Sequence, residues 1–241
     1  MISRYEKMSQ TAAVKAKEYL SRDALSHIDM LEAIDRGRAD ILYAERGGVI
    51  LIERESQSCM ISVDEISICE ALPSLGSFPQ YAAHQRDVAA YIARERTFPY
   101  SLTVRQAAYL KKEPPCVSEA DIRPLTDEFT ETVFLNYEAM DDPAYIRELI
   151  SRGQMWGIFK DGLLAGFIGE HLEGSMGLLE VLPEHRGRGY GYALESFLIG
   201  RTLARGSIPF CQVVTGNRPS LALQKKLGMA ISKGKTYWLF N

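Results

Sequence analysis

The segment Leu178–Leu194, LLEVLPEHRGRGYGYAL, decides the fold that we predict for this chain. It reads as an apolar strand, a proline stop, a basic glycine-rich turn and the start of a helix. Residues of such a strand alternate between the two faces of a sheet. One face is expected to hold Leu178, Glu180 and Leu182, and the other Leu179 and Val181. Pro183 cannot donate to a sheet ladder, so strand pairing should end there.

The glycine-rich turn is typical of a cradle for an anion. Gly187, Gly189 and Gly191 permit positive φ and let a ligand approach the backbone without meeting a Cβ. From Tyr190 onward, apolar residues recur with helical spacing, so the turn is followed by a helix start. The first N–H groups of a helix lack internal partners and carry partial positive charge, both of which favour a phosphate. Arg186 and Arg188 would add full charges beside them.

Two well-known phosphate motifs are excluded by the spacing. No G-x-x-x-x-G-K-[ST] string is present, which excludes a P-loop. The dinucleotide fingerprint needs a third glycine and an acidic residue about 20 residues later, whereas no Asp or Glu follows Glu195. On glycine spacing alone, a tight strand-to-helix turn without a ligand remains the alternative.

The whole string Pro183–Gly191, PEHRGRGYG, resembles motif A of the GNAT superfamily of N-acetyltransferases. Downstream, Thr215–Met229, TGNRPSLALQKKLGM, is similar to motif B of the same superfamily. The resemblance extends from about Val117 to Asn241. It implies an α/β fold in which a mixed sheet, flanked by helices, splays between its fourth and fifth strands.

The resemblance also implies that acetyl-CoA binds in the splay as co-substrate. Its pyrophosphate would lie on the turn, and its pantetheine arm beside the preceding strand. The cofactor-binding residues expected from the matching positions are Leu179, Val181, Leu182, Arg186, Gly187, Arg188, Gly189, Tyr190, Gly191, Tyr192 and Asn217. Asn217 is equally suited to cap the following helix, in which Pro219 is tolerated near the start and Gly228 suits the end.

Glu180 is the candidate catalytic base, because it lies on the strand beside the expected thioester site. A partly buried carboxylate there would have a raised pKa, as a general base requires. The alternatives are a counter-ion for the substrate amine or a solvent-facing side chain. In one branch of the superfamily a glutamate and a tyrosine act as base and acid, but the matching positions here look like Gln212 and Gln224, which do not titrate. Further candidates are Glu170 and His171 as bases, and Tyr190, Tyr192 and Tyr237 as acids.

The C-terminal charge pattern favours a polyphosphate ligand. Between Ser196 and Asn241 there are seven Lys or Arg residues and no Asp or Glu. The alternative is a basic surface that faces solvent and binds no ligand. Nucleic-acid binding is not favoured, because the net charge is −3 and aromatic residues are not interleaved with the basic ones.

Composition places the chain among ordinary globular proteins, with 46% hydrophobic and 24% charged residues in 241 positions. No apolar run is long enough to span a membrane, and the N-terminus lacks the apolar core of a signal peptide. The four cysteines have neither metal-ligand nor disulfide spacing, so we expect no metal, a reduced cytoplasmic setting and thiols inside the core.

We predict an N-terminal α+β domain over residues 1–110, a linker over 111–120 and a GNAT-like domain over 121–241. The linker contains Pro114-Pro115, which disfavours helix or strand. In the C-terminal part, a first strand is expected over Asp121–Leu125, with helices near Asp127–Tyr137 and Pro143–Arg152. Asp161-Gly162 between apolar runs predicts a hairpin, and Thr236–Phe240 a last strand.

The N-terminal half has a weaker pattern. A helix is expected over Thr11–Arg36, a hairpin over Ile41–Glu53, a strand over Cys59–Val63, a helix over Tyr81–Arg94 and a strand over Leu102–Tyr109. These could form a degenerate GNAT-like half without a cofactor site, or an unrelated α+β domain. The N-terminal half could shape an acceptor pocket or form a homodimer contact.

Two functions follow from these patterns. The first is transfer of an acetyl group from acetyl-CoA to a primary amine of a small molecule or peptide by direct attack. The second is a non-catalytic acyl-CoA-binding sensor or regulatory module on the same scaffold, which Gln212 and Gln224 favour. The acceptor cannot be predicted, because the fold does not select it.

Overall fold

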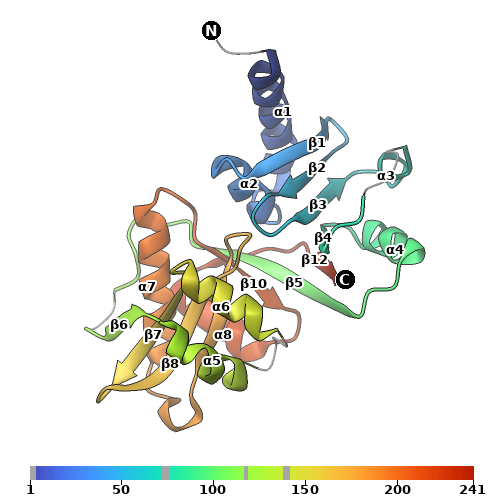
Figure 1. Cartoon of the computed structure of the whole chain (residues 1–241). Coiled ribbons are helices and arrows are strands. Elements are labelled where there is room, and N and C mark those ends of the chain that lie inside the picture. Colours follow the sequence, from blue (N-terminus) through green and yellow to red (C-terminus); the bar gives the residue numbers. More distant parts are fainter. Residues whose placement is uncertain (1–3, 72–75, 117–118, 138–141) are drawn as a thin grey trace. The chain divides into compact units, whose positions relative to one another are not determined.

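The computed structural model describes residues 4–71, 76–116, 119–137 and 142–241. Its contacts divide the chain into two compact units, each with a sheet and flanking helices (Figure 1). The first unit comprises Met1–Ala108, Gln212–Asn217 and Ile231–Asn241, and the second comprises Tyr109–Cys211 and Arg218–Ala230. The units therefore follow the chain order only in part, because the last strand of the chain packs with the N-terminal residues. The assignment of two domains over 1–110 and 121–241 stays a prediction.

The first unit contains a sheet with the strand order β1-β2-β3-β4-β12-β5. Its strands are β1 (Ala39–Glu45), β2 (Gly48–Glu53), β3 (Ser58–Val63), β4 (Gln80–Ala83), β5 (Tyr100–Ala108) and β12 (Thr236–Phe240). Its helices are α1 (Arg4–Leu20), the 3-10 turn η1 (Ser21–Asp23), α2 (Ile28–Asp35), α3 (Ser67–Ala71) and α4 (Arg86–Glu95). Two apolar clusters form its core: one contains residues of α1 and α2, and the other residues of α3 and α4.

Two predictions for this half are wrong in part. The single helix expected over Thr11–Arg36 is broken after Leu20, where the Asp23 side chain accepts a hydrogen bond from the Ser26 N–H and so competes with helix continuation. The helix expected from Tyr81 begins only at Arg86, because the preceding residues form β4, which pairs with β3 and β12. The hairpin and the strands β3 and β5 are confirmed.

The second unit contains the strand order β10-β9-β8-β7-β6, with the end of β10 assigned to the first unit. These strands are β6 (Asp121–Pro124), β7 (Met155–Lys160), β8 (Leu163–Glu170), β9 (Met176–Val181) and β10 (Phe210–Val214), and a short β11 (Ala230–Ile231) follows later. The helical elements are η2 (Asp127–Phe129), α5 (Thr130–Asn136), α6 (Pro143–Ser151), η3 (Pro183–His185), α7 (Tyr190–Ala204) and α8 (Arg218–Leu227).

The first strand, the two helices, the hairpin and the last strand predicted for the C-terminal part are confirmed, as is an α/β architecture with a mixed sheet flanked by helices. Asp161 and Gly162 both have positive φ, as the predicted hairpin turn requires. Phe167 on β8 lies in the apolar cluster that contains residues of α5 and α6. Its neighbour Gly166 lies against α7, where Leu194 packs. The alternation along β8 therefore places one helical layer on each face of this sheet.

The two units share a pattern of strand pairing. In the first, β1, β2 and β3 are antiparallel and β4 joins β3 in parallel. In the second, β7, β8 and β9 are antiparallel and β10 joins β9 in parallel. The shared order supports the hypothesis of a degenerate GNAT-like half, which stays a hypothesis. In the described parts of the chain, no helix has the length and apolar content to span a membrane.

Candidate functional site

The strand β9 contains a bulge at the point where a cofactor arm is expected. Gly169 on β8 is paired with Gly177 and Phe167 with Glu180, so β9 carries one extra residue between these pairs. Leu178 has a positive φ of 49° within this stretch. The predicted faces of β9 are nevertheless found: Leu178 and Leu182 lie in the same apolar cluster as Phe167, the residue opposite Glu180. Val181, opposite Gly166, lies on the other face near Gly191 of α7.

The other edge of β9 has little strand pairing. Among the described residues, the parallel ladder between β9 and β10 has a single register pair, Cys211 with Met176. The rest of β9, up to Val181, pairs with β8 on its other edge. Backbone groups on the unpaired edge of a strand are available to a ligand.

The glycine-rich turn has the conformation that the sequence predicts. Gly187 and Gly189 have φ values of 75° and 84°, and a Cβ at either position would meet no atom within 4 Å. Gly189 is the N-cap of α7, and no side chain in the described ranges caps this end of the helix. The first N–H groups of α7 are therefore without a side-chain acceptor. Gly191 lies inside the helix and is not one of the positive-φ glycines.

The absence of a side chain at Gly191 allows close packing around the first turn of α7. A Cβ at this position would lie 3.7 Å from Val181 Cγ2 on β9 and 3.8 Å from Leu223 Cδ2 on α8. The first turn of α7 therefore lies between the end of β9 and α8. Both predicted motifs contribute to this region, because α7 follows motif A and α8 belongs to motif B.

Glu180 and Arg186 form an ion pair at the end of β9. Arg186 Nη2 donates to Glu180 Oε1 at 3.0 Å, and Arg186 Nε donates to the Val181 carbonyl at 2.9 Å. The Glu180 side chain is 28% exposed, so the carboxylate can be reached from outside. Arg186 is thus bound back onto β9, and the carboxylate that we predicted as a base already has a cationic partner.

A pocket of about 370 Å³ opens beside the turn and lies wholly within the second unit. It is formed where the linker, β6 and β7 face the start of α7. Its lining residues are Cys116, Glu119, Ala120, Asp121, Ile158, Phe159, Lys160, Arg188, Gly189, Tyr190, Tyr192, Ala193 and Lys226.

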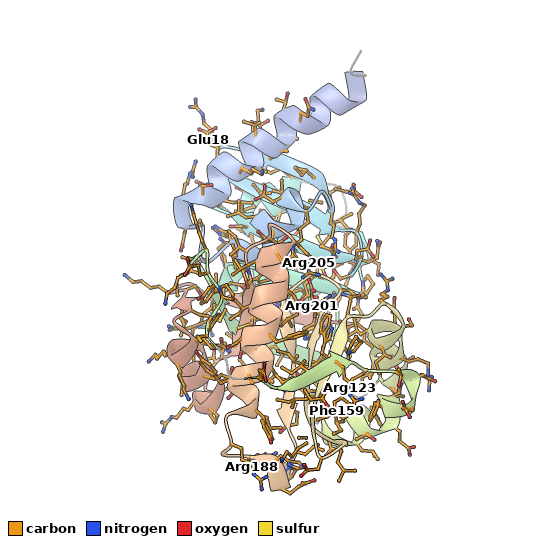
Figure 2. The ribbon with its side chains drawn as sticks, turned by 90° about the vertical axis from the view of Figure 1, so that its left-hand side faces the viewer. Glu18, Arg123, Phe159, Arg188, Arg201 and Arg205 are labelled. Atoms are coloured by element: carbon orange, nitrogen blue, oxygen red, sulfur yellow. The ribbon has the colours of Figure 1, made fainter. Side chains whose placement is uncertain are left out.

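The cations of this pocket come from three separate segments. Arg188 belongs to the turn, Lys160 to β7 and Lys226 to α8, where its Nζ lies 5.1 Å from the centre of the Tyr192 ring. Figure 2 shows Arg188 below the first turn of α7, with Arg123 and Phe159 on the strands beside it. Within the described part of the chain, neither Arg188 nor Lys226 makes a salt bridge. Both charges can therefore meet an anionic ligand without first breaking an ion pair.

The pocket contains only some of the predicted residues. Arg188, Gly189, Tyr190 and Tyr192 line it, and the sequence also predicted a ligand role for each. Lys160, Lys226 and Cys116 also line the pocket and were missed, because nothing in the local sequence singles them out as ligand-binding residues. Glu195 was missed as well, although a single acidic residue within an apolar helical segment indicates a buried carboxyl group.

Other predicted residues lie elsewhere. Glu170 is buried and paired with Arg205 at 2.7 Å, and His171 Nδ1 lies 3.0 Å from the Tyr145 hydroxyl. Glu170 and His171 therefore lie near the Met176 end of β9, away from the turn. Burial raises the pKa of the Tyr145 hydroxyl. Asn217 directly precedes α8, as expected for a cap position.

The two glutamines are packed rather than exposed. Gln212 accepts a hydrogen bond from Trp238 Nε1, and Gln224 is 3% exposed. Tyr237, named above as a candidate acid, packs at the edge of an apolar cluster in the first unit, and its neighbour Trp238 is buried.

We expect thiol labelling of the native protein to detect one fast-reacting cysteine. Cys59, Cys69 and Cys211 are buried, as predicted, whereas Cys116 is exposed, so a core position for all four was wrong. Burial raises the pKa of Cys59 to about 12 and that of Cys69 to about 11, so few thiolates form there at pH 8. With Ellman's reagent, one thiol should react within minutes and the others only after denaturation. Fast labelling that persists in Cys116→Ser would contradict this assignment.

Comparison with known proteins confirms the resemblance to the GNAT superfamily at the level of fold. The sequence model of the FR47-like protein family matches residues 155–239. A Drosophila protein of known X-ray structure is similar over 98% of this chain and 96% of its own, with a TM-score of 0.71 and 17% identity. A search of curated proteins finds no significant match.

Two further similar structures have acetyltransferase in their names. A GCN5-related N-acetyltransferase-like protein from Streptococcus suis covers 99% of this chain and 100% of its own, with a TM-score of 0.56 and 15% identity. An acetyltransferase of the GNAT family from Colwellia psychrerythraea covers 100% and 98%, with a TM-score of 0.53 and 12% identity. At such identities the likeness establishes the fold and leaves the substrate open.

Proposed function

We propose that this protein transfers an acetyl group from acetyl-CoA to a primary amine by direct attack of the amine on the thioester. The observation that carries the proposal is the start of α7: an uncapped helix N-terminus behind two open glycines with positive φ. Arg188 and Lys226 line the adjoining pocket. The oxygens of a phosphate at this position would accept hydrogen bonds from the free N–H groups and lie near both cations.

These residues fit the phosphate-bearing part of CoA. The absence of a Cβ at Gly187 and Gly189 lets a phosphate oxygen approach the backbone closely. Tyr190 and Tyr192 also line the pocket and offer apolar surface beside the charges. Acetyl-CoA would supply the activated acyl group as a thioester. We assign Leu179, Val181, Leu182 and Asn217 to the arm of the cofactor, and Gly187 to Tyr192, with Arg186, to its phosphates.

The remaining chemistry falls to β9 and its side chains. The bulge around Leu178 leaves an extra backbone N–H on β9, which can polarise a carbonyl group. Glu180 is the proposed base for the amine, or its counter-ion before attack. Its pairing with Arg186 keeps the carboxylate at the end of β9 and near the turn. Tyr190 and Tyr192 line the pocket that we assign to the phosphates, so we propose neither as the acid for the leaving thiolate.

We expect Glu180→Gln to lower kcat for amine acetylation by about 10²- to 10⁴-fold, because the amide cannot accept a proton. The Kd for CoA should change less than about threefold, since Glu180 lies outside the pocket lining. Glu184→Gln is the matched control, because the Glu184 side chain is 67% exposed in the same region. Equal kcat values for the two variants would exclude Glu180 as the base.

A non-catalytic CoA-binding module is the second candidate. The packed Gln212 and Gln224 favour it, because they replace the titrating groups expected by resemblance. Release of the CoA thiol from acetyl-CoA, measured with a panel of small-molecule and peptide amines, separates the two functions. Turnover with any acceptor supports the enzyme, whereas CoA binding without turnover supports the module.

A further inference from the structure

Glu195 is the one charged residue among the buried residues of α7, which otherwise are apolar or carry a hydroxyl group. It is the one acidic residue of α7 and is 2% exposed. Among the residues that the structure describes, its Oε2 atom is buried without a hydrogen-bond partner, and so is the Oε1 atom of Gln224 on α8. Two buried acceptors in one cluster are costly unless a proton lies between them.

Glu195 lies where three elements meet. It follows Gly191 by one helical turn, so both residues are on the face of α7 that approaches α8. At the first turn the neighbour on α8 is Leu223, and at the second it is Gln224, which hydrogen-bonds to Glu195. The Cys211 thiol on β10 is its other hydrogen-bonding partner.

The surroundings of Glu195 favour the neutral acid. Burial raises the pKa of Glu195 from its ordinary value of 4.5 to about 7, although the hydrogen bonds of Gln224 and Cys211 oppose the shift. The same burial, with the nearby carboxyl, raises the pKa of Cys211, so this thiol stays protonated. The groups that act on Glu195 are an amide from α8 and a thiol from β10, with no Lys, Arg or His among them.

We propose that Glu195 is a positioning residue, whose protonated carboxyl donates to Gln224 Oε1 and so holds α8 against α7. Loss of the proton leaves a buried carboxylate opposite a buried carbonyl oxygen, which weakens this contact. Lys226 follows Gln224 on α8 and lines the pocket over Tyr192. Any loosening of α8 therefore displaces one of the cations that face the proposed phosphate, so ligand binding should weaken as the pH rises through about 7.

The direction in which pH changes the folding stability follows from the same proton on Glu195. The folded chain keeps it up to about pH 7, whereas the unfolded chain releases it near 4.5. The folded state therefore binds more protons between these values, and its stability declines as the pH rises through this window. A neutral side chain at position 195 should remove the decline.

Glu195→Gln tests the proposal, because its amide N–H₂ can donate to Gln224 Oε1 at any pH. Hydrogen exchange of α8 should be equal in the two proteins at pH 6 and at least threefold faster in the wild type at pH 8. The Kd for CoA should rise about five- to tenfold more in the wild type than in the variant over the same interval. Glu131→Gln, which alters an exposed acid on α5, should behave as the wild type.

The two readouts separate this inference from the proposed function, on which the CoA readout rests. If CoA does not bind at any pH, the proposed function fails, and the exchange of α8 still decides the role of Glu195. Equal exchange in wild type and Glu195→Gln at both pH values would overturn the inference. Should that variant fail to fold, Gln224→Leu serves instead: it removes the acceptor, and faster exchange of α8 already at pH 6 is expected. Unchanged exchange in Gln224→Leu would also overturn it.

Discussion

Replacing Gly189 by Trp should raise the Kd for CoA at least about 100-fold while the protein remains folded. The indole would begin where a Cβ meets no protein atom within 4 Å, which is the space that the proposed phosphate occupies. Losing two hydrogen bonds to a charged group, at about 1.5–3 kcal/mol each, costs at least about 3 kcal/mol, which is enough for this change in affinity. Isothermal titration calorimetry with CoA measures it directly.

Gly206→Trp is the matched control for this experiment. Gly206 follows the other end of α7, has a φ of 77° and also has no atom within 4 Å of a Cβ. Both variants place a side chain in the left-handed region, at a cost of about 1–2 kcal/mol. They should therefore lose similar thermal stability, while only Gly189→Trp loses CoA binding. Similar Kd values for the two variants would show that the turn does not hold the ligand.

Replacing Phe167 by Ala should lower the free energy of unfolding by about 3–5 kcal/mol. Phe167 is fully buried on β8 in the cluster that joins the sheet to α5 and α6. It also lies directly across the ladder from Glu180, so its ring supports the bulged part of β9. A cavity of this size would remove a large share of the stability of a typical domain, which is about 5–15 kcal/mol.

Leu163→Ala, at the start of the same strand, gives the comparison. The Leu163 side chain is 69% exposed, so its loss should cost less than about 0.5 kcal/mol. Urea denaturation monitored by fluorescence and circular dichroism provides both values. A loss below about 1 kcal/mol for Phe167→Ala would contradict the packing of β8 against α5 and α6.

The parts of the fold that sequence reasoning predicted are those with local causes. The turn at Gly187 and Gly189 requires glycine for conformational reasons, and the helix that follows has a clear apolar period. The hairpin at Asp161-Gly162 is fixed by its own two residues. Such features depend on neighbours in the chain, so a single sequence contains the information.

The parts that it missed depend on distant partners. The residues of β4 have a composition suited to helix and become a strand because β3 and β12 pair with them. The bulge in β9 arises from the fit to β8 and leaves no mark in the alternation of apolar residues. For the same reason, Lys160 and Lys226 join Arg188 in one pocket only after β7 and α8 have packed around α7.

The central claim, that the turn before α7 binds acetyl-CoA, is tested most directly by calorimetric titration of acetyl-CoA into the wild-type protein. We predict saturable binding with one site per chain, weakened by added salt because Arg188 and Lys226 contribute charge. Absence of binding heat at several temperatures, with acetyl-CoA at millimolar concentration, would contradict both the enzyme and the binding module.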